Sequence, residues 1–186
     1  MSKPKILIIL ETNGISERLG LSNEQIEELA TRMLSGRFDA KFLQSIVDFD
    51  YDVNAEDLLY RVDTESKNAL TDDYDCVVAE GVQAWLWLQS RYNIPVVCIN
   101  PVLNPRQLIG DMMSCQTIGS FKSINGLRRL RIEDAICVVS ADCALDIDYD
   151  EIFGDKNVIY SDFEFDTPEF WDEHQQLVEA IENIIE

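Results

Sequence analysis

The chain has 186 residues, 46% of them hydrophobic, which is enough for one sizeable buried core and too few for two. It carries 35 acidic residues, 15 basic residues and one histidine, for a formal net charge of −20 at pH 7. Because nucleic acids and anionic lipid surfaces are bound by clustered lysine and arginine, this charge argues against a nucleic-acid or membrane partner. We expect a single domain over residues 1–186.

The first part of the chain alternates between strand and helix patterns. The apolar run at residues 5–10 predicts a buried strand, and Ser22 followed by Gln25 forms a Ser-x-x-Gln cap that predicts a helix over residues 23–35. The same reasoning predicts a strand at 40–47 and a helix at 55–69.

The apolar run near the N-terminus, Ile6 to Leu10, is followed at once by Glu11. This is shorter than a secretory signal, and no stretch approaches the roughly 20 apolar residues of a transmembrane helix. The cysteines are odd in number and widely spaced, which indicates reduced thiols; they are Cys76, Cys98, Cys115, Cys137 and Cys143. We therefore expect a soluble, cytoplasmic protein.

The middle of the chain predicts a strand at 75–79, a helix at 81–92 and a strand at 95–99. Trp85 and Trp87 lie two residues apart on this helix and point about 200° apart. We therefore expect one of the two indoles to be exposed.

The last part of the chain predicts strands at 135–140 and 157–160. Thr167, followed by a proline and a glutamate, predicts a final helix from residue 168 to the end. Alternating strands and helices predict a three-layer α/β/α fold with a mostly parallel sheet. Residues 103–134 fit this alternation least well, and we expect a cap or irregular insertion there.

Open parallel sheets bind ligands beyond the carboxyl ends of their strands. The polar residues that follow the predicted strands, and are therefore candidate binding residues, are Glu11, Thr12, Asn13, Glu80, Gln83 and Asn100. None of the turns contains a glycine-rich nucleotide-binding motif. We expect no cofactor.

The block Val77–Pro105, VVAEGVQAWLWLQSRYNIPVVCINPVLNP, resembles the small bacterial esterases of the α/β-hydrolase superfamily, the YqiA-type group. In that family a nucleophile elbow and its helix lead to a strand that ends in Asn-Pro. The resemblance extends to Asn13, in place of the oxyanion loop, to Asp142, in place of the catalytic acid, and to residues 161–166, in place of the histidine loop. It implies an α/β-hydrolase-like fold.

The family's Gly-x-Ser-x-Gly elbow needs a serine on a strained turn and small flanking residues. When the motif is aligned with residues 77–81, Val77 occupies the position of the first glycine and Ala79 occupies the position of the nucleophilic serine. Glu80 would supply the oxyanion amide, but it brings a carboxylate to the place where negative charge develops. We therefore expect the esterase chemistry to be lost.

The one histidine, His174, lies four residues after Phe170 and three before Leu177. This spacing predicts that it shares the inward face of the final helix, as a structural residue. Asp142 has no histidine–serine pair to orient, and we interpret it as a cap for the turn after its strand.

Two acidic runs, at 48–54 and 146–150, copy the opening spacing of a calcium loop. Their sixth positions are Val53 and Glu151 where the loop needs glycine. We expect no metal site.

Three hypotheses follow for the function. The first is a non-catalytic α/β-hydrolase-like protein that binds a small molecule or a protein partner through its degenerate cleft. The second is a hydrolase with a rebuilt site that uses His174, Asp142 or Glu80, and the third is an acidic protein-interaction module. An enzyme requires a pocket that joins those three residues, a binder requires a cavity without a nucleophile, and an interaction module requires neither.

Overall fold

The computed structural model describes residues 2–10, 23–43, 55–103 and 130–186. They contain one six-stranded sheet in the order β2-β1-β3-β4-β5-β6, in which every neighbouring pair is parallel. The strands are β1 Lys5–Ile9, β2 Asp39–Leu43, β3 Cys76–Glu80, β4 Val96–Ile99, β5 Ala135–Val139 and β6 Val158–Tyr160. The predicted α/β class is confirmed.

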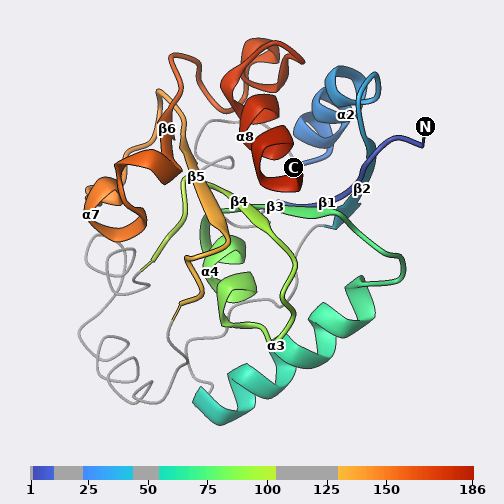
Figure 1. The fold of residues 1–186 in the computed structure, drawn as a ribbon, viewed down its shortest axis with the longest axis vertical. Helices are drawn as coiled ribbons and strands as arrows, with labels where there is room; N and C mark the ends of the chain where they lie inside the picture. The colour runs from blue at the N-terminus through green and yellow to red at the C-terminus, as the bar shows by residue number, and fades with distance from the viewer. Residues whose placement is uncertain (1, 11–22, 44–54, 104–129) are drawn as a thin grey trace.

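The helices cover both faces of the sheet. They are α2 Asn23–Leu34, α3 Ala55–Ala69, α4 Gly81–Gln89, α7 Tyr149–Phe153 and α8 Gln176–Ile185, with 3-10 turns η1 Asp155–Asn157 and η2 Pro168–Trp171. Figure 1 shows α2 and α8 on one face, α3 and α4 on the other, and α7 beside β6. The predicted three-layer arrangement is therefore confirmed.

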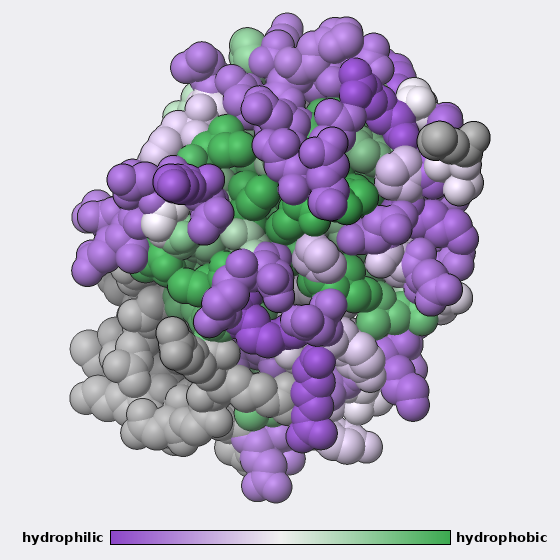
Figure 2. Space-filling model, in the orientation of Figure 1, coloured by the Kyte–Doolittle hydropathy of each residue, from purple (hydrophilic) through white to green (hydrophobic). Residues whose placement is uncertain are grey.

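Strands β1, β3, β4 and β5 are mostly apolar because both faces of the sheet are buried there, whereas the edge strand β2 carries the exposed Asp39 and Lys41. Alternate residues of β1 point to opposite sides: Ile6 and Ile8 pack with α2 and α8, while Leu7 and Ile9 pack with α3 and α4. In Figure 2, hydrophilic side chains cover most of the visible helical surface, and hydrophobic side chains emerge in a band between the two layers.

Helix α4 is buried over its whole length. The side chains of Trp85 and Trp87 are 3% and 0% exposed, so the prediction that one of them would be exposed is wrong. The reason is that α4 contacts β3 and β4 on one side and α3 on the other. A helix covered on opposite sides has no solvent-facing stripe.

The final helix begins later than predicted. Residues 168–171 form η2, a turn follows, and α8 starts only at Gln176. The carboxylate of Asp172 accepts the backbone N–H of His174 at 2.9 Å, and such a local bond competes with continued helix.

Two other expectations concern the insertion and the absence of a transmembrane helix. The insertion expected at 103–134 lies almost entirely outside the described residues. No helix in the described part of the chain is long and apolar enough to cross a membrane.

Candidate functional site

The carboxyl ends of β3, β4 and β5 bring buried polar side chains to one edge of the sheet. We call this set the carboxyl edge; its members are Glu80, Gln83, Asn100, Ser140 and Asp142. All but Asp142, which is half-buried, are at most 4% exposed. The strand order reverses between β1 and β3, the position where open α/β sheets place their ligand crevice.

Strand β3 passes directly into helix α4 without a loop. Glu80 ends the strand and Gly81 opens the helix, with a positive φ of 59°. Glycine adopts this left-handed conformation without the steric penalty that a Cβ would bring. The Gly81 carbonyl accepts the backbone N–H of Val102 at 3.1 Å, which ties the turn to the segment after β4. A sharp strand-to-helix turn is also the place where α/β hydrolases hold their nucleophile.

The turn lies two residues beyond the predicted nucleophile position. Ala79 is inside β3, fully buried and paired with Ile9 and Cys98, so its side chain belongs to the core. The residue on the turn is Gly81, which has no side chain at all. A glycine between a buried strand and a helix was the signal in the sequence that would have located the turn.

Asn100 joins the ends of β4 and β5 through both of its side-chain polar atoms. Its Nδ2 donates to Ser140 Oγ at 2.7 Å, and its Oδ1 accepts the Ser140 N–H at 2.8 Å. Its own φ is 44°, a conformation that asparagine tolerates better than most residues. The candidate binding residue Asn100 therefore has a clear structural role at this edge.

Asp142 extends this chain of hydrogen bonds to the loop after β6. Its Oδ1 accepts from Ser140 Oγ at 2.5 Å and from the backbone N–H of Phe165 at 3.0 Å. The other carboxylate oxygen, Oδ2, is buried and has no hydrogen-bond partner among the described residues. Asp142 thus caps the segment after the next strand, whereas we predicted a cap for its own turn.

The other candidate binding residues divide into two groups. Glu80 lies opposite Ile99, the residue before Asn100, in the register of the sheet. Gln83 lies in the first turn of α4, so the backbones of Glu80, Gln83 and Asn100 are near one another. The side chain of Glu80 does not cap α4. The predicted residues Glu11, Thr12 and Asn13 lie outside the described residues.

His174 is not on the inward face of the final helix, so that prediction is wrong. It lies in the turn before α8, and its side chain is 72% exposed. Its Nε2 is 3.5 Å from Glu173 Oε1, and the Glu173 carboxylate also pairs with Arg37, just ahead of β2 at the amino edge of the sheet. No described contact joins His174 to Asp142 or Glu80.

The thiols of the described residues lie mostly in the core. Cys76, Cys98 and Cys137 are buried free thiols. Cys98 of β4 lies opposite Cys137 of β5 in the register of the sheet. Burial raises the pKa of the Cys76 thiol to about 12 and also raises the pKa of Cys98 and Cys137. The half-buried Cys143 lies 3.9 Å from the hydroxyl of Tyr149.

The acidic run at 146–150 serves the local fold. Asp148 caps α7 by accepting the backbone N–H of Glu151 at 3.0 Å, and Asp150 accepts the Tyr160 hydroxyl at 3.0 Å. Within the described ranges, no three histidine, cysteine or acidic side chains are grouped so that they could hold a metal ion. The run at 48–54 lies outside those ranges.

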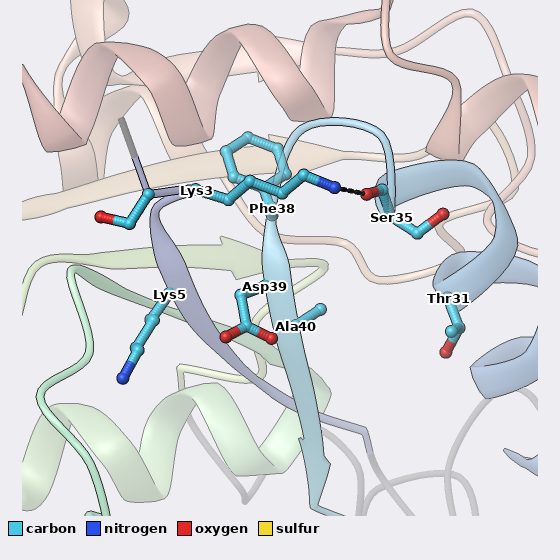
Figure 3. Close-up of a pocket in the computed structure, with 8 residues that line it drawn as sticks. Lys3, Lys5, Thr31, Ser35, Phe38, Asp39 and Ala40 are labelled. Carbon is cyan, nitrogen blue, oxygen red and sulfur yellow. Dashed lines mark hydrogen bonds between the residues drawn. The ribbon is translucent and has the colours of Figure 1, made fainter.

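A pocket of about 490 Å³ opens at the opposite, amino end of the sheet, between β1, β2 and the end of α2 (Figure 3). The Lys3 ammonium crosses it and donates to the Ser35 carbonyl at 2.5 Å, while Lys5 pairs with Asp72 at 2.8 Å. None of the predicted site residues that the structure describes lines this pocket. It is therefore separate from the carboxyl edge.

Comparison of the chain with protein-family models, with curated proteins and with solved structures found no match. The function must accordingly be argued from the geometry of the carboxyl edge.

Proposed function

We propose that this chain is an α/β-hydrolase-like protein without a nucleophile, and that it works by binding a small molecule at the carboxyl edge. The observation that carries the proposal is Gly81 on the turn between β3 and α4. Acyl transfer through a covalent intermediate needs a hydroxyl, thiol or carboxylate at the point of attack. A glycine at that point supplies none of them.

The position of the only histidine also favours binding over catalysis. A general base must come within about 2.6–3.2 Å of the proton that it removes. His174 is exposed, and it contacts Glu173 on the side of the molecule where Arg37 precedes β2. The rebuilt hydrolase site would need His174 beside Asp142 or Glu80, whereas the described contacts of His174 are with Glu173 and Asp172.

The buried polar groups favour a ligand at this edge. Burying polar side chains in a core costs free energy unless they are hydrogen-bonded, and an apolar edge would avoid that cost. Asn100 and Ser140 meet that condition through their mutual hydrogen bonds, and together with Glu80 they bury polar side chains at the ends of three adjacent strands. Ligand sites in open α/β sheets combine such convergent polar groups with apolar walls.

The first test is hydrolysis of a panel of short and medium acyl p-nitrophenyl esters and thioesters by the purified chain. We expect no turnover above the buffer rate. Gly81→Ser should also remain inactive, because a serine there would have no base to activate it. Turnover that is abolished by His174→Ala or Asp142→Ala would overturn the proposal.

The second test is binding, followed by backbone amide NMR during a screen of neutral, anionic and cationic fragments. We expect ligands to shift the amide signals of Gln83, Ser140 and Phe165. The amides of Ser35 and Asp39, in the separate amino-end pocket, serve as the internal control. If no fragment shifts the first group, the carboxyl edge is not a binding site.

A further inference from the structure

We propose that Asp142 Oδ2 accepts a hydrogen bond from a cationic nitrogen of the bound small molecule. The ligand class is therefore an amine, amidine or guanidine that carries at least one N–H. This inference rests on the proposed binding function and assigns its ligand chemistry.

The two oxygens of the Asp142 carboxylate differ in their surroundings. Oδ1 accepts two hydrogen bonds, from Ser140 Oγ and from the Phe165 N–H. Oδ2 is buried and accepts none from the described residues. Buried carboxylate oxygens are normally hydrogen-bonded, and an unpaired one in a folded protein calls for a missing donor.

The direction of the hydrogen bonds around Ser140 identifies Oδ2 as an acceptor. Ser140 Oγ already accepts from Asn100 Nδ2, so its single proton is free to point at Asp142 Oδ1. Phe165 supplies a second proton to the same oxygen. With two donors on Oδ1, the carboxylate offers Oδ2 to a donor from outside this chain of bonds.

The charge at this edge favours a cation over an anion. From Ile132 to the end of the chain, Lys156 is the only lysine or arginine, and it lies in η1, before β6 begins. An anionic ligand would be repelled by the Asp142 carboxylate, whereas a cation would be attracted to it.

The position of Asp142 places the acceptor close to the surface. Asp142 is half-buried and follows the exposed Ala141 in a turn that is closed by the Cys143 N–H on the Ser140 carbonyl at 3.1 Å. The carboxylate that carries Oδ2 is therefore on a side chain that is partly open to solvent. A small displacement there would bring a ligand nitrogen to the oxygen.

The test compares three benzyl compounds by NMR titration of the Phe165 amide, which reports directly on the carboxylate. Benzylammonium has both charge and N–H donors, benzyltrimethylammonium has charge alone, and benzyl alcohol has neither charge nor N–H. We expect benzylammonium to bind at least about tenfold more tightly than the other two.

The matched variants are Asp142→Asn and Asp146→Asn. Asparagine at 142 retains the Oδ1 acceptor and turns the Oδ2 position into an N–H donor, so benzylammonium should bind at least about tenfold more weakly. Asp146 is an exposed acid in the same loop, and its substitution removes the same charge with an expected effect within about twofold. Dispersed amide spectra of both variants establish that they fold.

The outcomes separate the two proposals. The inference about Oδ2 is wrong if benzyltrimethylammonium binds as tightly as benzylammonium. It is also wrong if Asp142→Asn leaves the affinity for benzylammonium unchanged. If neutral or anionic fragments shift the carboxyl edge while benzylammonium does not, the binding function stands and its ligand class is wrong. If no fragment of any class shifts this edge, both are wrong.

Discussion

The carboxylate of Asp142, which follows β5, accepts the backbone N–H of Phe165, which follows β6, at 3.0 Å. Phe165 is held from its other side as well, since its carbonyl accepts the indole N–H of Trp171 at 2.8 Å. The rings of Phe165, Phe170 and Trp171 pack edge to face with centroids 5.4–5.6 Å apart. These contacts fasten the carboxyl edge to the turn that leads into α8.

Asp142→Ala should destabilise the fold by about 1–3 kcal/mol, because it leaves the Ser140 hydroxyl and the Phe165 N–H without their acceptor. Urea unfolding measures the loss. Asp146→Ala, at an exposed position of the same loop, should change the free energy of unfolding by less than about 0.5 kcal/mol. Equal values for the two variants would contradict the role given to Asp142.

Gly81→Ala should cost about 1–2 kcal/mol, because a Cβ is disfavoured at a φ of 59°. Gly154→Ala is a second strained case, at a φ of 81° and with nothing within 4 Å of the added Cβ. Gly36→Ala is the control, since its Cβ would meet only the Glu173 carboxylate at an ordinary 3.5 Å. Thermal unfolding should rank Gly36→Ala as the most stable of the three; any other order would show that backbone strain at the turn is not the main cost.

Asn100→Ala should destabilise the fold by about 2–4 kcal/mol, from two lost hydrogen bonds and the strain of an alanine at a φ of 44°. Asn100→Gly loses the same bonds but relieves the strain, so it should unfold at a higher denaturant concentration than Asn100→Ala. The reverse order would mean that the left-handed backbone at this position carries no cost.

Thiol reactivity should divide the four cysteines that the structure describes into two groups. A thiolate is the reacting species, and burial keeps Cys76, Cys98 and Cys137 protonated, with the pKa of Cys76 raised to about 12. At pH 8 a chromogenic disulfide reagent should leave these three unmodified until denaturant is added. Cys143 should react slowly, because its pKa is also raised, and Cys143→Ser should remove that slow phase. Rapid modification of all thiols in the native protein would contradict the buried assignment.

Stability should also fall at alkaline pH. A thiol whose pKa is raised by folding stays neutral in the native state, while the unfolded chain loses that proton near its ordinary pKa of 9.0. The stabilisation is therefore complete below about pH 9 and is lost as the pH rises toward the folded pKa, about 12 for Cys76. Urea midpoints from pH 7 to 11 measure the slope, which should be shallower for Cys76→Ala.

The sequence was most informative where a local pattern and the packing agree. The Ser-x-x-Gln cap predicted a helix from residue 23, and α2 begins at Asn23; the apolar runs at 5–10 and 75–79 match β1 and β3 closely. Such patterns depend on neighbouring residues and on the burial of a whole face, and both can be read from the amino-acid sequence.

The errors came where one side chain or a distant helix decided the outcome. The helical spacing of Phe170, His174 and Leu177 is real, but the Asp172 carboxylate takes the His174 N–H and interrupts the helix. Helix α4, which carries both tryptophans, packs against β3, β4 and α3, and no pattern within α4 reveals that packing. The strand-to-helix turn falls at Gly81, two residues after the predicted position, because hydropathy shows that a buried strand exists but not at which residue it ends.

The direct passage from β3 into α4 leaves that junction no tolerance for a change in chain length. One inserted residue would rotate the whole helix by about 100° and advance it by about 1.5 Å against the sheet. Since every residue of α4 is buried, such a rotation would drive Trp85 and Trp87 into spaces shaped for smaller groups. Insertions and deletions should therefore be accepted in the connections elsewhere in this fold and rejected between Glu80 and Gly81.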